Sequence, residues 1–111
     1  MKTISVLSIV LLLFLIPCQA DPITPADAQS HIGETVTVKG TVDEVKASAK
    51  AMFLDFGRKY SNQEFTAVTF NTSFADALKA HQGKTISVTG EVQMYKGEPE
   101  IVVNDLAQIS K

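Results

Sequence analysis

The sequence predicts an all-β barrel with one short inserted helix. The stretch Gly33-Glu-Thr-Val-Thr-Val-Lys-Gly-Thr-Val42 recurs fifty residues later as Gly83-Lys-Thr-Ile-Ser-Val-Thr-Gly-Glu-Val92. Both copies alternate apolar and polar residues with period two, which indicates half-buried β-strands. Each copy contains a glycine, Gly40 or Gly90, at which a strand can bend sharply or carry a bulge. Two long bent strands suit a small closed barrel, in which strands coil round a narrow core.

The first twenty residues are expected to lie outside this barrel. Lys2 precedes an apolar run from Ile4 to Ile16, and Pro17-Cys-Gln-Ala20 closes the run with a small residue. This pattern is typical of a secretory signal peptide, here cleaved after Ala20. The apolar run is short for a membrane span of about 20 residues, although an uncleaved anchor is the alternative. We therefore expect a signal peptide at 1–20 and one periplasmic or secreted domain at 21–111 that does not span the membrane.

Composition limits the chemistry of the mature domain. Cys18 is the only cysteine, so the mature chain is expected to have no disulfide, thiol nucleophile or thiolate metal site. Without Lys2, which lies in the predicted signal peptide, the chain has nine Lys and Arg and twelve Asp and Glu, so the formal net charge of the mature domain is −3. A generic polyanion binder is basic, so this mild acidity argues against strong, charge-driven nucleic-acid binding.

Short-range signals define the order of the elements. Thr24 is expected to cap a short helix from Pro25 to His31. The expected strands cover Glu34 to Ala47, Ala51 to Phe56, Glu64 to Asn71, Lys84 to Tyr95, and Glu100 to Val103. A second helix, from Phe74 to Ala80, follows the capping segment Asn71-Thr-Ser73. The last two strands meet in a hairpin whose turn needs a positive φ angle at Gly97.

Alternation along the second and third strands predicts which side chains face the core. In the second strand one face carries Met52, Leu54 and Phe56, and the other carries Phe53 and Asp55. In the third strand we expect Val68 and Phe70 to point inward, and Phe65, Ala67 and Thr69 to point outward. On this reading Phe53 and Phe65 both face away from the barrel interior on neighbouring strands.

The order β-β-β-α-β-β is that of the five-stranded Greek-key OB barrel, which binds ligands on strands two and three and the adjoining loops. Three segments, 53–66, 83–92 and 95–103, resemble small bacterial OB-fold domains of the nucleic-acid-binding type. Such domains occur alone behind signal peptides or attached to secreted nucleases. The resemblance implies an exported, non-enzymatic binding protein whose partner is nucleic acid, preferably single-stranded.

Flat rings on the second and third strands favour stacking with bases. Cations near that face would neutralise phosphates. Tyr95 is open to two readings, as a ligand clamp or as a residue that packs the hairpin. The predicted nucleic-acid site consists of Lys39, Lys46, Lys50, Phe53, Arg58, Lys59, Tyr60 and Phe65.

Two other functions remain open. The sequence contains no nucleophile elbow, phosphate-binding glycine loop or metal-ligand spacing, so neither catalysis nor a cofactor is expected. The same face would serve an interaction module for an envelope protein, a glycan or a small ligand, and the net acidity favours this alternative. An accessory role beside a secreted nuclease is the third possibility. The acidic residues that dilute the expected positive face are Asp55, Glu64, Glu98 and Glu100.

Overall fold

The computed structural model describes residues 21–58 and 62–111. The predicted signal peptide at 1–20 lies outside the described residues, as do the predicted site residues Lys59 and Tyr60. In the part of the chain that is described, no helix is long and apolar enough to cross a membrane.

The order of strands and helices agrees with the sequence prediction, with a short sixth strand added. The elements are η1 (Pro25–His31), β1 (Thr35–Ala47), β2 (Met52–Phe56), β3 (Phe65–Thr69), η2 (Thr72–Phe74), α2 (Ala75–Lys79), β4 (Thr85–Tyr95), β5 (Glu98–Val102), η3 (Leu106–Gln108) and β6 (Ile109–Ser110). The helix expected at 74–80 is therefore a 3₁₀ turn followed by about one and a half turns of α-helix.

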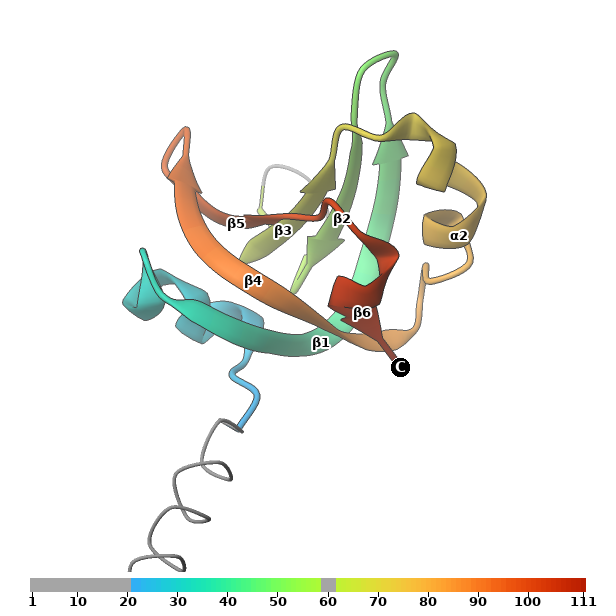
Figure 1. The fold of residues 1–111 in the computed structure, drawn as a ribbon. Coiled ribbons are helices and arrows are strands. Elements are labelled where there is room, and N and C mark those ends of the chain that lie inside the picture. The colour runs from blue at the N-terminus through green and yellow to red at the C-terminus, as the bar shows by residue number, and fades with distance from the viewer. Residues whose placement is uncertain (1–20, 59–61) are drawn as a thin grey trace, which may run out of the picture.

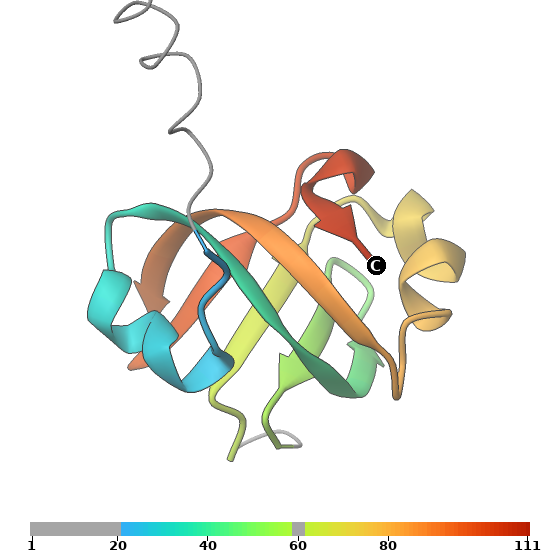
Figure 2. The ribbon, with the colours of Figure 1, turned by 90° about the horizontal axis from the view of Figure 1, so that it is seen from below.

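The strands form a barrel of the OB type. The sheet order is β1-β2-β3-β5-β4-β6, and a further pairing between β1 and β4 joins the two sides of the sheet. All pairings between these strands are antiparallel except that of β3 with β5. β1 and β4 curve together under the barrel, with η1 beside them, and α2, which follows β3 in the chain and precedes β4, lies at one side of the barrel (Figures 1 and 2). Alternating apolar residues on these strands fill the interior.

The two copies of the repeated sequence pair with each other. β1 and β4 run antiparallel, with Val38 opposite Val88. Of the two features expected at Gly40, a sharp bend or a bulge, the pairing with β4 shows no bulge, because its register there is continuous. The bulge in β1 falls between Val42 and Glu44, in the pairing with β2. Its extra residue changes which face the later side chains occupy, so Val45 packs against the core.

The glycines of the repeat allow close packing. A Cβ atom on Gly40 would lie 2.6 Å from Cγ of Pro25, the first residue of η1. A Cβ atom on Gly90 would lie 2.6 Å from Cγ2 of Ile101 on β5. Contacts this short are not tolerated by carbon atoms, so both positions require glycine for the approach of a neighbouring segment.

Local capping residues act as predicted. The Thr24 hydroxyl accepts a hydrogen bond from the backbone N–H of Asp27 at 3.2 Å. The Asn71 side chain accepts one from the backbone N–H of Ser73 at 3.0 Å. In the β4–β5 hairpin both Lys96 and Gly97 have positive φ angles, of 51° and 81°, which suits a two-residue turn of the primed type.

The side chains of β3 that face the core are those that the sequence predicted to face outward. Phe65 and Ala67 belong to the core cluster and are fully buried, and Thr69 is buried as well. Phe70, expected in the core, lies beyond the end of β3 and is 65% exposed. The inward face is fixed by pairing with β2, where Phe65 lies opposite Phe56. Their rings pack tilted in the core with centroids 5.4 Å apart, so Phe65 presents no ring for stacking at the surface.

Candidate nucleic-acid interface

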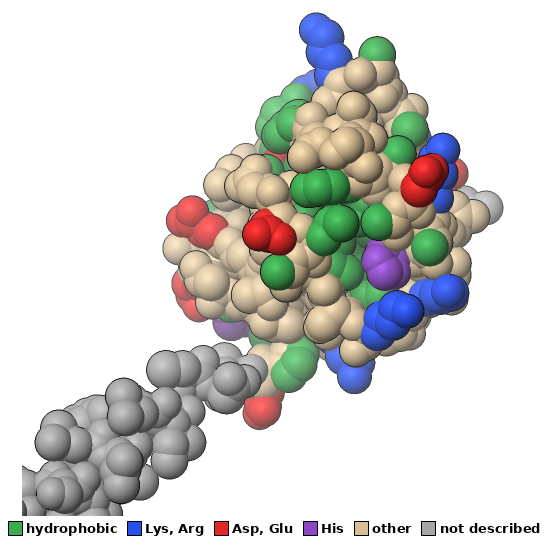
Figure 3. Space-filling view, turned by 45° about the vertical axis from the view of Figure 1, so that its right-hand side comes forward, with side chains coloured by type: hydrophobic (Ala, Val, Ile, Leu, Met, Phe, Trp, Pro, Cys, Tyr) green, Lys and Arg blue, Asp and Glu red, His purple; other side chains and the backbone are tan. Residues whose placement is uncertain are grey.

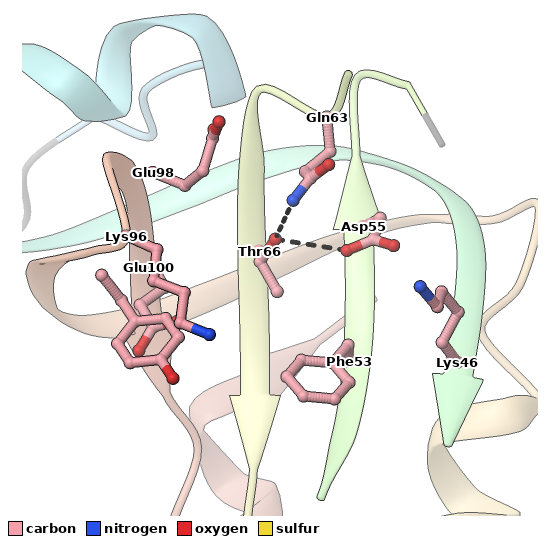
Figure 4. A pocket seen from close by; sticks show the side chains of 9 residues that line it. Lys46, Phe53, Asp55, Gln63, Thr66, Lys96, Glu98 and Glu100 are labelled. Atoms are coloured by element: carbon pink, nitrogen blue, oxygen red, sulfur yellow. Dashed lines mark hydrogen bonds between the residues drawn. The ribbon is translucent and has the colours of Figure 1, made fainter. Parts of the chain in front are cut away.

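A cleft of about 400 Å³ lies on the outer face of the barrel. Its size falls in the range of small-molecule sites. Five strands, β1 to β5, and the β4–β5 turn contribute to it, and the labelled side chains point to the same side of the sheet (Figure 4). The lining residues are Lys46, Phe53, Asp55, Gln63, Thr66, Tyr95, Lys96, Glu98 and Glu100.

Strand register brings three polar residues into one row across the sheet. Asp55 on β2 lies opposite Thr66 on β3, and Thr66 lies opposite Glu100 on β5. Residues directly opposite on paired strands point to the same face. The row therefore crosses the cleft between Lys46 on β1 and the β4–β5 turn.

A chain of hydrogen bonds runs along this row. The Gln63 amide nitrogen Nε2 lies 3.4 Å from Thr66 Oγ1, and the Thr66 hydroxyl donates to Asp55 Oδ1 at 3.2 Å (Figure 4). Because a hydroxyl has a single hydrogen, Thr66 accepts from Gln63 and donates to Asp55. Asp55 Oδ2 and Gln63 Oε1 are buried, and neither has a hydrogen-bond partner within the described ranges.

Burial changes the acidity of two of the carboxyl groups. Removal from water raises the pKa of Asp55, which is only 1% exposed, and the nearby carboxylate of Glu44 adds to the effect. The Thr66 hydrogen bond and the positive charge of Lys46 oppose this change. Partial burial likewise raises the pKa of Glu100. Both shifts mean that negative charge is disfavoured in the cleft unless a ligand supplies donors or positive charge.

Two aromatic side chains border the cleft. Phe53 is partly exposed, two residues before Asp55 on the same face of β2, and its ring is seen nearly face-on in Figure 4. Tyr95, at the end of β4, is 54% exposed. The ammonium nitrogen of Lys96 lies 5.4 Å from the centre of the Tyr95 ring, within the range of a cation–π contact. The cleft therefore offers two flat rings in its lining.

The structure gathers only part of the predicted site. Lys46 and Phe53 line the cleft. Lys39, Lys50 and Arg58 are exposed but do not line it. Lys50 precedes β2 and Arg58 follows it, so these two cations lie at opposite ends of that strand. The outward placement predicted for Phe65 is wrong, because pairing with β2 puts its ring in the core.

Seven lining residues were not among the predicted site residues: Asp55, Gln63, Thr66, Tyr95, Lys96, Glu98 and Glu100. The sequence indicates Asp55, Glu98 and Glu100 as acidic residues of the expected face and Tyr95, in one of two readings, as a ligand clamp, whereas it assigns no role to Gln63, Thr66 and Lys96. Period-two alternation already places Asp55 beside Phe53 on one face of β2. Thr66 and Glu100 reach that face only through the registers of β3 and β5, which are long-range properties of the sheet.

A different face of the protein is more apolar. Hydrophobic side chains gather over α2 and the C-terminal segment, around a histidine and with lysines or arginines along one edge (Figure 3). The exposed large hydrophobic residues of the chain include Phe70 and Leu106. No group of three or more His, Cys, Asp or Glu side chains suited to a metal ion occurs in the two described ranges, 21–58 and 62–111.

Comparison with known families decides the class of the domain. The family model described as an OB-fold nucleic acid binding domain, of the tRNA anti-codon type, matches residues 36–109, from β1 to β6. The chain belongs to this family. The match extends over the whole barrel and confirms the OB fold predicted from the sequence. No match was found among curated proteins.

Solved structures with the same fold come from larger enzymes and from small binding proteins. The OBody AM1L10 bound to hen egg-white lysozyme has a TM-score of 0.59 and 16% identity, covering 84% of this chain and 97% of the OBody. Asparaginyl-tRNA synthetase from Pyrococcus horikoshii has a TM-score of 0.58 and 20% identity, covering 78% of this chain and 22% of the synthetase. Aspartyl-tRNA synthetase from Entamoeba histolytica has a TM-score of 0.55 and 16% identity, covering 80% and 21%. The chain thus spans only about a fifth of each synthetase.

Proposed function

We propose that this domain is a non-catalytic binding module that holds single-stranded nucleic acid across the outer face of β2 and β3. The observation that carries the proposal is the position of Phe53. In a chain of the OB-fold nucleic acid binding family, its partly exposed ring lines a cleft on the expected binding face. Stacking of a base on such a ring contributes roughly 1–3 kcal/mol and tolerates any base.

Tyr95 extends the stacking surface. It is more exposed than Phe53 and lies on the far side of the cleft, at the start of the β4–β5 turn. Loops at this end of an OB barrel commonly contact the ligand. A strand lying across the cleft would place one base on Phe53 and a neighbouring base against Tyr95.

Cations around the cleft are suited to phosphate contacts. Lys46 and Lys96 line it, while Lys50 and Arg58 are exposed at the two ends of β2. Lys39 lies on the half of β1 that pairs with β4, and we do not include it in the interface. Few cations and a net negative charge predict modest affinity that weakens with salt.

A pair of phenylalanine variants tests the proposal. Binding of the chain from Asp21 to Lys111 to a labelled thymidine oligomer is measured by fluorescence anisotropy at low salt. We expect Phe53→Ala to weaken binding by about tenfold, the equivalent of one lost stacking contact. Phe70→Ala is the matched control, because Phe70 is an exposed ring that does not line the cleft. Equal effects of the two substitutions would contradict the assignment of the site.

The acidic side chains of the cleft favour a second candidate, a partner protein with cationic side chains. Asp55, Glu98 and Glu100 outnumber the two lysines of the lining. A domain of this fold can recognise a protein, since the structurally similar OBody AM1L10 is bound to hen egg-white lysozyme. Titration with an arginine-rich hexapeptide separates the two functions: saturable binding to the peptide and none to the oligomer would favour a protein partner.

A further inference from the structure

The buried polar atoms of the cleft that have no hydrogen-bond partner are both acceptors. The relay from Gln63 through Thr66 to Asp55 fixes the direction of its two bonds. It leaves Asp55 Oδ2 and Gln63 Oε1, both oxygens, without a partner among the residues that the structure describes. Carboxylate and amide oxygens accept hydrogen bonds and cannot donate them. This part of the cleft is therefore complementary to a group that carries N–H donors.

Asp55 is the stronger of the two acceptors. Its side chain lines the cleft and the residue is only 1% exposed, so the unpartnered oxygen is a desolvated carboxylate oxygen. A buried acceptor left unsatisfied is costly, and hydrogen bonds to charged groups are the strong ones. A ligand that donates to this oxygen gains more than one that forms the same bond at an exposed site.

We infer that this cleft selects guanine from a single strand, by donation from its N1–H and 2-amino group to Asp55 and Gln63. The inference rests on the proposed nucleic-acid function and adds base selectivity to it. Guanine carries two neighbouring donor positions on one edge. Phe53, on the same face of β2 as Asp55, supplies a ring on which the base lies while that edge turns toward the row of polar residues.

The other bases fit these acceptors less well. Thymine and uracil present a single N–H between two carbonyl oxygens, and those oxygens would face the carboxylate. Adenine and cytosine present an amino group beside a ring nitrogen that is itself an acceptor. Two acceptors forced together are a strong source of discrimination, because a buried polar group is left unpaired.

Entry of the base requires rotation of a side chain that covers these buried oxygens. Asp55 Oδ2 and Gln63 Oε1 are shielded from water in the structure. Gln63 and Lys46 are the long side chains that flank Asp55 in Figure 4. Rotation of such side chains on binding is common even where the backbone stays in place. Lys46 then lies beside the cleft, where it can contact the phosphate of the bound nucleotide.

Single-base replacements in a thymidine oligomer test the selectivity. The probes carry guanine, inosine or thymine at one central position, and inosine differs from guanine only by the missing 2-amino group. We expect the guanine probe to bind about tenfold more tightly than the other two, as for one good base contact. The thymines on either side of the central position are the same in every probe, so the ratio of two affinities depends on the central base alone.

Asp55→Asn provides the decisive variant. The asparagine side chain would keep an oxygen for the Thr66 hydroxyl and place an amide N–H₂ where Oδ2 was, so that a donor replaces the acceptor. We expect the guanine-to-thymine ratio to fall to about one or to invert. Asp76→Asn removes an equal charge from exposed α2, away from the cleft, and should leave the ratio unchanged.

The outcomes separate this inference from the function on which it rests. Binding of all three probes with equal affinity, or a guanine preference that survives Asp55→Asn, overturns the inference and leaves nucleic-acid binding intact. Binding of none of the probes at low salt overturns the proposed function and the inference with it. A guanine preference that Asp55→Asn abolishes and Asp76→Asn retains supports both.

Discussion

The hydroxyl of Thr66 donates to Asp55 Oδ1 at 3.2 Å, across two paired strands and inside a buried part of the cleft. This bond holds a carboxylate whose other oxygen has no partner within the described residues. The arrangement is costly for folding, because the desolvation of the charge is opposed only in part by the Thr66 hydrogen bond and the nearby Lys46. Costs of this kind concentrate at sites that bind ligands.

Asp55→Asn is expected to stabilise the protein at neutral pH. Burial raises the pKa of Asp55, so the folded state holds its proton more tightly than the unfolded state does. The stability that protonation contributes is complete below the unfolded value of about 3.9 and is lost as the pH rises through the raised value. The variant does not titrate there, so its advantage should grow as the pH rises over this range.

Urea unfolding of both proteins from pH 3 to pH 7 measures this advantage. The charges of Glu44 and Lys46 on β1 act on the pKa of Asp55, and Glu100 on β5 lies in the same row; all three remain in the variant. Their contribution therefore cancels to first order in the difference. An advantage that is constant with pH would show that Asp55 has an ordinary pKa.

Thr66→Val is expected to destabilise the protein by about 1–3 kcal/mol at neutral pH, since it removes the donor to a buried carboxylate oxygen while keeping the side-chain shape. The pKa of Asp55 should rise further, because the hydrogen bond that lowers it is gone. Thr66→Ser keeps the hydroxyl and is the control. If valine and serine variants unfold at the same urea concentration, the bond contributes nothing to stability.

Gly40→Ala is expected to cost about 1–3 kcal/mol through overpacking. The added methyl group would meet the ring of Pro25 at 2.6 Å. Pro25→Ala removes the ring, so part of the loss should be recovered in the double variant Pro25→Ala with Gly40→Ala. Strictly additive losses in this double-mutant cycle would mean that Pro25 is not what excludes a side chain at Gly40.

Truncation of Phe65 should mainly lower the stability of the protein, whereas truncation of Phe53 should mainly weaken binding. Phe65→Ala leaves a cavity beside Phe56 in the core and should lower stability by about 3–5 kcal/mol. Phe53→Ala, at a partly exposed ring of the cleft, should cost no more than about 1 kcal/mol while weakening oligomer binding. Thermal unfolding compares the two, and similar losses would contradict the assigned orientation of β3.

Cleavage after Ala20 is a prediction from the sequence alone. Expression of the full chain in a bacterium with an intact secretion system should yield a mature protein that begins at Asp21. The intact mass of the protein recovered from the periplasm or medium checks this. Recovery of the full-length chain with the membrane fraction would favour an uncleaved anchor.

The sequence predicted those elements that depend on local signals. The repeat defined β1 and β4, and Thr24 and Asn71 capped the helices as expected. The prediction of which face of β3 points inward was wrong because both faces of this strand carry apolar residues. Phe65 with Ala67 and Val68 with Phe70 are equally acceptable as an inward set, and pairing with β2 selects the first.

The candidate site was predictable only in part for the same reason. Phe53 and Asp55 share a face through simple alternation on one strand. The Asp55–Thr66–Glu100 row depends on the parallel pairing of β3 with β5, which brings together residues far apart in the sequence. The bulge between Val42 and Glu44 also carries no sequence signal of its own, yet it sets which side of β1 faces the cleft.

The most direct test of the proposed nucleic-acid binding is to measure the affinity of the domain for a single-stranded oligomer as the salt concentration rises. Among the described residues, the cations placed to contact phosphates are Lys46, Lys50, Arg58 and Lys96. We expect measurable affinity at low salt and, from these four cations, a logarithmic salt slope of about −3, since each phosphate contact contributes roughly 0.7. Absence of binding at low salt, where electrostatic attraction is least screened, would contradict the proposal.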